Sequence, residues 1–277
     1  MPSDPAIKAA TAIRSAGCLV ITAGAGMGVD SGLPDFRGNS GFWKAYPLYE
    51  RRGLSFVQAA NPAHFEEDPH FGWGFYGHRT ELYRRTVPHQ GFGLLRNWSK
   101  RYALDTFVVT SNVDGQFQKA GFGEDQMWEI HGSIHFLQCP ACCHEAIWPN
   151  RAKFVIDESS LRTRDVPLCP RCRRVARPNI LMFNDYAWLP HRSVAQEEGF
   201  NDFLARHSDD RMVVIEIGAG STIPTIRRRS ERLGQRDKTT VLRINPWEAQ
   251  IAAPHLSFSC GALAALEKID QGLATLG

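Results

Sequence analysis

The chain has 277 residues, of which 43% are hydrophobic and 22% are charged, with a formal net charge of +3 at pH 7. These values are typical of a soluble globular protein, and so mild a charge does not by itself indicate binding to nucleic acid or to an anionic membrane. No apolar stretch approaches the roughly 20 residues that span a bilayer, and the N-terminal segment lacks the charged start and apolar centre of a signal peptide. We therefore expect a cytoplasmic protein with no membrane partner.

Short apolar segments alternate with segments of helical spacing along most of the chain. A first helix is expected at 5–16, with Pro5 in its first turn, and further helices at 89–101 and 221–234. The segments expected to form buried strands are 18–22, 106–110, 128–132, 212–218 and 241–245. Because strands that alternate with helices favour a parallel sheet covered on both faces, we predict an α/β fold with a doubly wound, Rossmann-like parallel sheet.

Two segments interrupt this alternation. Residues 39–88 are aromatic and helical in spacing, and residues 133–183 hold most of the cysteines. We expect both to project from the sheet as a small lobe made of a helical insertion and a zinc ribbon. The large domain is then assembled from residues 1–38, 89–132 and 184–277.

Four of the seven cysteines form two C-x-x-C pairs, Cys139 with Cys142 and Cys169 with Cys172. In a chain without export signals, two such pairs favour a four-thiolate zinc site over disulfides. The zinc is expected to be structural, since four sulfurs leave no open position for water. Cys143 adjoins one ligand and is a competitor for the metal.

A glycine-rich stretch, GAGMGVDSGLPDFRG at 24–38, follows the apolar run 19–21. At the end of a strand in such a sheet, a turn of this kind offers bare N–H groups and a helix dipole to a phosphate. It lacks the Gly-Lys-Ser/Thr of a nucleoside triphosphate loop. The alternative interpretation is an ordinary structural turn.

An ordered set of motifs carries more information than any one of them. GAGMGVDSGLPDFRG is followed by TSNVDGQFQKAG at 110–121, EIHGS at 129–133, the two C-x-x-C pairs, RPNILMFND at 177–185, IGAGS at 217–221 and IN at 244–245. In this order the chain resembles, over roughly residues 5–265, the sirtuin (Sir2) family of NAD-dependent protein lysine deacylases. The resemblance implies NAD as co-substrate, acyl-lysine proteins as partners, and nicotinamide and O-acyl-ADP-ribose as products.

The resemblance also implies roles for individual residues. His131 would be the base that takes a proton from a ribose hydroxyl, and Asn112 would orient a water beside that ribose. The implied cofactor-binding residues are Ala23, Gly24, Ala25, Gly26, Asp35, Phe36, Arg37, Ser111, Asn112, Asp114, Gly218, Ala219, Gly220, Ser221 and Asn245. The open alternatives are a satisfied core histidine at 131 and an ordinary Asx turn at 112–115.

Tyr76 and Arg79 form a Y-x-x-R sequence whose spacing puts both side chains on one helix face. Sirtuins that remove succinyl and malonyl groups have a similar Y-x-x-R, in which the two residues grip the distal carboxylate of the acyl chain. The resemblance therefore implies a desuccinylase or demalonylase, with acetyl as a weaker or alternative substrate. The alternative is an amphipathic helix with an exposed arginine.

Some positions depart from the familiar motifs. Ser111 stands where most members of the family have glutamine, and FND at 183–185 replaces FGE. Two other functions stay open on this ground: a sirtuin-like mono-ADP-ribosyltransferase or NAD hydrolase, and a non-catalytic zinc-ribbon adaptor. Binding of nucleic acid is expected only in the last case.

Overall fold

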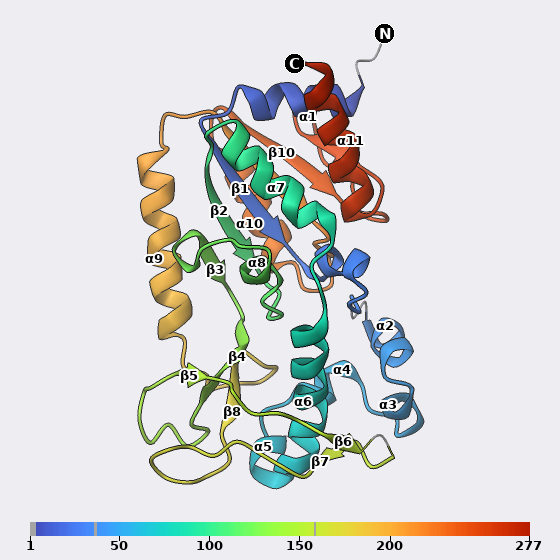
Figure 1. Cartoon of the computed structure of the whole chain (residues 1–277), viewed down its shortest axis with the longest axis vertical. Coiled ribbons are helices and arrows are strands. Elements are labelled where there is room, and N and C mark those ends of the chain that lie inside the picture. The colour runs from blue at the N-terminus through green and yellow to red at the C-terminus, as the bar shows by residue number, and fades with distance from the viewer. Residues whose placement is uncertain (1–3, 36–37, 158) are drawn as a thin grey trace.

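Figure 1 shows the computed structural model of the chain, which describes residues 4–35, 38–157 and 159–277. In the described chain a six-stranded parallel sheet has the order β11-β10-β9-β1-β2-β3. Its strands are β1 (Cys18–Ala23), β2 (Asp105–Thr110), β3 (Met127–Glu129), β9 (Met212–Ile217), β10 (Thr239–Ile244) and β11 (Leu256–Phe258). The predicted Rossmann-like sheet is confirmed.

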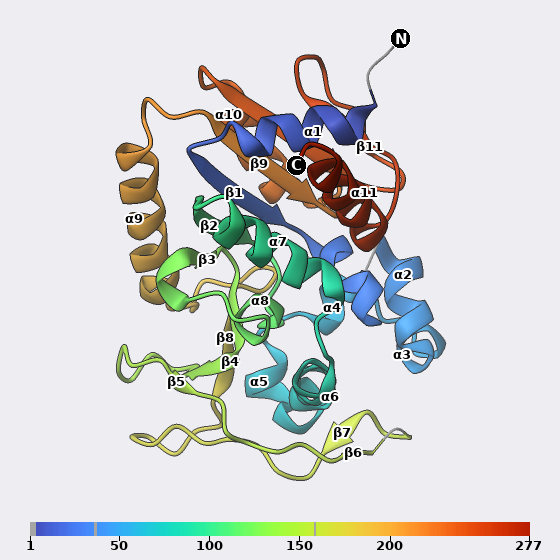
Figure 2. The ribbon, with the colours of Figure 1, turned by 45° about the horizontal axis from the view of Figure 1, so that its top comes forward.

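Helices cover both faces of this sheet (Figures 1 and 2). One face packs against α1 (Pro5–Arg14), α7 (Gln90–Arg101) and α11 (Ala262–Thr275), and the other against α9 (His191–Arg206) and α10 (Thr225–Gly234). Alternate residues of β1 serve the two cores, since Leu19 and Ile21 join the first and Val20 the second. Both faces are therefore apolar, which explains why the strands are continuous apolar runs.

A second lobe lies at the other end of the molecule (Figure 1). Its helices are α2 (Gly38–Ala45), α3 (Pro47–Arg51), α4 (Phe56–Ala59), α5 (His64–Glu67) and α6 (Pro69–Arg85). An antiparallel sheet of order β5-β4-β8 is formed by β5 (Trp148–Pro149), β4 (Gly132–Gln138) and β8 (Arg177–Ile180), and a small ribbon by β6 (Ile156–Asp157) and β7 (Arg162–Thr163). The large sheet lies wholly within the segments assigned to the large domain, while the domain boundaries themselves stay a prediction.

Helix α6 joins the two halves of the small lobe and carries Tyr76 and Arg79. Asp68 caps its N-terminus by accepting a hydrogen bond from the Phe71 backbone N–H at 3.3 Å, and Pro69 occupies its first turn. Gly74 lets the zinc-ribbon segment lie against the helix, because a Cβ there would be 1.8 Å from the Leu161 carbonyl oxygen.

Several boundaries differ from those expected. The segment 128–132 does not stay in the sheet: β3 ends at Glu129 and β4 of the small lobe begins at Gly132, so His131 lies at the junction. Helix α10 begins at Thr225, directly after Pro224. The remaining short elements are η1 (Ala25–Ser31), α8 (Gln116–Lys119) and η2 (Glu124–Gln126). No helix among the described residues has both the length and the apolarity that crossing a membrane requires.

Candidate active site

The glycine loop after β1 packs directly on a second glycine loop after β9. The Gly24 N–H donates to the Ile217 carbonyl at 2.9 Å, and the Gly26 N–H donates to the Gly218 carbonyl at 3.1 Å. A Cβ on Gly26 would lie 2.6 Å from the Gly218 Cα, so only glycine permits this approach. Strand order reverses between β1 and β9, and ligands of open α/β sheets bind at such a switch point.

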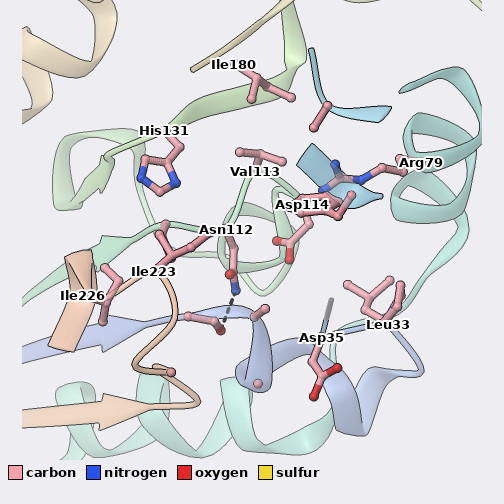
Figure 3. A pocket seen from close by; sticks show the side chains of 18 of the residues that line it. Leu33, Asp35, Arg79, Asn112, Val113, Asp114, His131, Ile180, Ile223 and Ile226 are labelled. Atoms are coloured by element: carbon pink, nitrogen blue, oxygen red, sulfur yellow. Dashed lines mark hydrogen bonds between the residues drawn. The ribbon is translucent and has the colours of Figure 1, made fainter. Parts of the chain in front are cut away.

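A cavity of about 560 Å³ opens at this point, between the sheet and the small lobe (Figure 3). Thirteen residues from the predicted site line it: Gly24, Ala25, Gly26, Asp35, Tyr76, Arg79, Ser111, Asn112, Asp114, His131, Gly218, Ala219 and Gly220. Ala23 and Ser221 are chain neighbours of lining residues, and the Asn245 amide donates to the carbonyl of the lining residue Ala219 at 2.9 Å. None of the three lines the cavity itself. Phe36 and Arg37 fall outside the described residues.

His131 enters the cavity from the junction of β3 and β4 (Figure 3). Burial lowers the pKa of its imidazole below the ordinary value of 6.5, although a hydrogen bond with the Ser111 backbone acts in the opposite direction. The ring is therefore neutral at physiological pH, as a general base requires. Gly132 makes this position possible, because its φ is +75° and a Cβ there would lie 2.1 Å from the Asn179 carbonyl oxygen.

Asn112 and Asp114 follow β2 and face the same cavity. The Asn112 side-chain amide donates to the Gly24 carbonyl at 3.0 Å and so ties the β2 end to the glycine loop. Asp114 forms the Asx turn that the alternative interpretation proposed, since its Oδ1 accepts from the Gln116 N–H at 2.9 Å. Asp114 also lines the cavity, and burial raises the pKa of its carboxyl to about 6. The Asx turn therefore forms part of the site, and the two interpretations of this segment are compatible.

Tyr76 and Arg79 of α6 both line the cavity. Arg79 reaches it from the side away from His131 (Figure 3). Arg79 is 7% exposed, which contradicts the alternative of an exposed arginine. Its Nε and Nη2 donate to the Tyr83 hydroxyl at 3.0 and 2.7 Å, and the rings of Phe75, Tyr76 and Tyr83 lie 5.2 to 5.8 Å from its guanidinium carbon. Burial raises the pKa of Tyr76 to about 12, so its phenol is neutral. At this end of the cavity the buried guanidinium of Arg79 is therefore surrounded by uncharged aromatic rings.

The cavity wall includes Phe183, the first residue of the FND sequence at 183–185. Asn184 has φ +55°, a left-handed conformation that asparagine tolerates better than most residues. The Asp185 side chain is fully buried, forms an ion pair with Arg177, and accepts hydrogen bonds from the Met182 and Ala187 N–H groups at 3.1 and 3.2 Å. One carboxylate thus organises the loop that brings Leu181 to the cavity.

The apolar part of the cavity wall is not among the residues predicted from the sequence. Its side chains come from the loops after η1 and β2, from α4 and the residue after it, from the end of β8 and the stretch that follows, and from the start of α10 and the loop before it. The residues are Leu33, Pro34, Phe56, Val57, Ala60, Val113, Ile180, Leu181, Met182, Phe183, Ile223 and Ile226, together with Thr222 and Tyr83, which also carry a hydroxyl. Tyr83 was accessible to sequence reasoning, because it lies four positions after Arg79 on the same helix face.

Ser221 and Asn245 lie after β9 and β10, as expected, but their polar groups bond to protein. The Asn245 amide donates to the Ala219 carbonyl at 2.9 Å, and its oxygen accepts from the Trp247 and Glu248 N–H groups at 3.0 and 3.1 Å. The Ser221 N–H and hydroxyl both donate to the Glu248 carboxylate. These residues brace two loops against each other.

The cysteines of the small lobe converge, with one correction to the predicted set. Cys139, Cys143, Cys169 and Cys172 place their sulfurs within 4.8 Å of one another. The prediction of Cys142 is wrong: it is exposed, its φ is +45°, and its sulfur lies 3.6 Å from the Ala187 carbonyl oxygen. Its left-handed backbone turns the chain so that the neighbouring Cys143 faces the group. Four thiolates this close fit the tetrahedral arrangement of a structural zinc site.

Comparison with known proteins agrees with this geometry. Residues 24–204 match the model of the Sir2 family. The chain is 30% identical over 200 residues to an NAD-dependent protein deacylase of Thermococcus kodakarensis, covering 72% of this chain and 69% of the relative. It is 30% identical over 223 residues to an NAD-dependent protein deacylase of Aeropyrum pernix, covering 80% and 78%. A crystal structure of a Sir2 homologue with NAD has the same fold, with a TM-score of 0.74, 22% identity, and coverage of 98% of this chain and 94% of that one. The chain therefore belongs to the Sir2 family, and the sirtuin resemblance of its sequence is confirmed.

Proposed function

We propose that the protein is an NAD-dependent protein lysine deacylase that prefers succinyl and malonyl groups. The observation that carries this proposal is a single cavity with two differently equipped ends. A neutral imidazole and two interlocked glycine loops lie at one end, and a buried arginine lies at the other. The curated relatives are named for NAD-dependent deacylation, which supports the reaction class.

The cofactor end of the cavity suits a dinucleotide. Gly24, Gly26 and Gly218 bring backbone close to any ligand at the switch point, where NAD would supply the ribosyl carbon that receives the acyl oxygen as nicotinamide leaves. His131 takes a proton from a ribose hydroxyl, because its lowered pKa keeps the imidazole unprotonated. Asn112 holds the glycine loop in place for this step.

The acyl end of the cavity suits a carboxylate. Arg79 carries a guanidinium whose planar donors match a carboxylate, and Tyr76 lies beside it as a neutral phenol. A buried cation attracts an anionic acyl terminus more strongly than an exposed one, because less water screens the charge. An acetyl group has no such terminus and gains nothing from Arg79.

The cysteine group would hold zinc for stability and not for catalysis. Four sulfurs close the coordination sphere, so the ion has no open position for water or substrate. The metal would fix the strands of the small lobe that carry Leu181 toward the cavity.

The proposal is tested by incubating the protein with NAD and with matched acetyl-, succinyl- and malonyl-lysine peptides, followed by mass spectrometry. We expect loss of the acyl group and formation of O-acyl-ADP-ribose, fastest with the acidic acyl groups. Release of nicotinamide without peptide, or a mass gain on protein, would indicate an NAD hydrolase or an ADP-ribosyltransferase instead.

The acyl preference is tested separately with Arg79→Met. This variant is expected to keep deacetylation and to lose desuccinylation, because only the acidic substrate uses the guanidinium. Tyr83→Phe serves as a matched control, since it removes the two hydrogen bonds that Arg79 donates to the Tyr83 hydroxyl but leaves the charge of Arg79. An equal loss of both activities in Arg79→Met would contradict the assigned role.

A further inference from the structure

Lys119 of α8 caps the C-terminus of α6, the helix that carries Arg79. Its Nζ donates hydrogen bonds to the main-chain carbonyls of Tyr83, Arg84 and Thr86, at 2.8, 2.6 and 2.8 Å. The last four carbonyls of a helix have no partner within the helix, and the three donors of an ammonium match the three carbonyls held here. The positive charge also lies at the end of the helix dipole that favours a cation. Lys119 therefore fixes where α6 ends.

The segment that carries Lys119 begins at the cavity wall. Asp114 lines the cavity directly before α8, and its Oδ1 accepts from the Gln116 N–H at 2.9 Å. The His135 Nε2 donates to the Asp114 carbonyl at 3.0 Å, and a Cβ on Gly115 would lie 2.7 Å from the His135 ring. This turn is tightly packed and α8 is only one turn long, so the backbone of Lys119 is held at a fixed position relative to Asp114.

The last turn of α6 in turn holds Arg79. The Tyr83 hydroxyl accepts two hydrogen bonds from Arg79, and the Tyr83 ring lies 5.4 Å from the guanidinium carbon. The main-chain carbonyl of Tyr83 accepts from Lys119 and also from the Gln116 Nε2, at 3.3 Å. A continuous set of contacts therefore joins Asp114 to Arg79, and both of these residues line the same cavity (Figure 3).

We propose that Lys119 is a positioning residue for the acidic acyl group, because it holds the last turn of α6, and with it Arg79, at a fixed position relative to the loop that carries Asp114. This assignment rests on the proposed function. A succinyl or malonyl chain has a fixed reach from its amide to its carboxylate. The guanidinium must therefore lie at a matching distance from the end of the cavity where the acyl oxygen reacts. An acetyl group has no carboxylate, so its binding does not depend on where Arg79 lies.

A second anchor keeps α6 in place when Lys119 is changed. Arg84 donates to the carbonyls of Asn150 and Ala152 and forms an ion pair with Glu81 at 3.1 Å, and none of these contacts involves Lys119. Lys119 is itself exposed, so a substitution there leaves no cavity in the core. We therefore expect Lys119→Met to fold, with its effect confined to the geometry of the last turn of α6.

The test compares kcat and KM for succinyl-lysine and acetyl-lysine peptides of the same sequence, with the zinc-loaded full chain at saturating NAD. The variant is Lys119→Met, which removes the ammonium and keeps an unbranched side chain. Lys119→Arg restores a cation with several donors. The matched control is Lys100→Met, the same change at an exposed position in the last turn of α7.

We expect Lys119→Met to raise the KM for the succinyl peptide by about tenfold or more, because a misplacement of about 1 Å can cost as much as about 100-fold. The KM for the acetyl peptide should keep its wild-type value. Lys119→Arg should recover most of the loss, and Lys100→Met should match the wild-type protein with both peptides.

Two kinds of result would overturn the assignment. An unchanged KM for the succinyl peptide in Lys119→Met, or an equal rise for both peptides, overturns the role of Lys119 alone, since the wild-type protein still removes succinyl groups. A wild-type protein that removes neither acyl group, or only the acetyl group, overturns the proposed function and this assignment with it.

Discussion

The backbone N–H of Leu181 donates a hydrogen bond to the carbonyl oxygen of His131, with 3.0 Å between nitrogen and oxygen. Next to this bond, Gly132 of β4 pairs with Ile180 of β8. The wall against which the acyl-lysine would lie and the proposed base are therefore two sides of one backbone ladder. A displacement of the loop after β8 is expected to move the imidazole as well.

The buried pair of Arg177 and Asp185 is the main anchor of that loop. We expect Asp185→Asn to lower the free energy of unfolding by about 3 kcal/mol, because it leaves a buried guanidinium without its counter-charge. The KM for an acylated peptide should rise as well, since the loop lines the cavity. Denaturant unfolding and steady-state kinetics measure the two effects.

Asp68→Asn is the control for this pair. Asp68 pairs with Arg162 at the surface, where an ion pair contributes only about 0 to 1 kcal/mol, and asparagine still caps helix α6. Equal destabilisation by the two substitutions would show that burial does not set the energy of the Arg177–Asp185 pair.

Of the two neighbouring cysteines Cys142 and Cys143, only Cys143 belongs to the group of four converging sulfurs. We expect Cys142→Ser to bind about one zinc ion per chain, like the wild-type protein, because its sulfur lies outside the cysteine group. Cys143→Ser should lose zinc and a large part of its thermal stability, because it removes one of four ligands. Zinc content after dialysis, measured by atomic absorption, distinguishes the two. Retention of zinc by Cys143→Ser together with its loss from Cys142→Ser would restore the C-x-x-C interpretation.

Activity should fall on the acid side as His131 becomes protonated. Burial lowers its pKa below 6.5, so we expect deacylation to be independent of pH near 7 and to decline only below about pH 6.5. His131→Ala should reduce kcat by about 100-fold or more. The pH profile of kcat/KM for NAD provides the measurement.

Asp114 is the competing source of an acid limb, because burial raises its pKa to about 6. The variant Asp114→Asn distinguishes the two groups. If His131 causes the loss of activity at low pH, this variant shows the same loss at low pH, with lower activity at every pH. An acid limb that disappears in Asp114→Asn would assign the ionisation to the carboxyl.

The sequence predicts the sheet well because the evidence for it is local. Residues 18–22 and 106–110 are β-branched runs, and both are strands of the central sheet. The segment 128–132 was predicted as one strand, but its residues belong to two different sheets. It leaves the first at Glu129 and joins the second at Gly132, and only the tertiary pairing with β8 separates them.

Which individual residues form the site depends on backbone conformations and long-range contacts, and hydrophobic periodicity does not reveal these. The choice between Cys142 and Cys143 is settled by one left-handed residue, whose conformation follows from the turn as a whole. The bond between Ser221 and Glu248 joins residues 27 positions apart, so no local pattern indicates it. Arg79 was found because the helix fixes its spacing from Tyr76 within one short motif.

His207 links the stability of the fold to pH at the edge of the sheet opposite the cavity. Burial lowers the pKa of its imidazole, but hydrogen bonds to Asp105 at 2.9 Å and Asp210 at 2.7 Å raise it to a net value above 6.5. A histidine with a raised folded pKa stabilises the protein fully below its unfolded pKa, and that contribution is lost as the pH rises through the folded pKa. We therefore expect the free energy of unfolding to decrease from pH 6 to pH 8 in the wild-type protein.

His207→Gln should flatten this slope, and His191→Gln, an exposed position on α9, should leave it unchanged. Denaturant titrations at several pH values measure it, and an unchanged slope in His207→Gln would mean that another group is responsible.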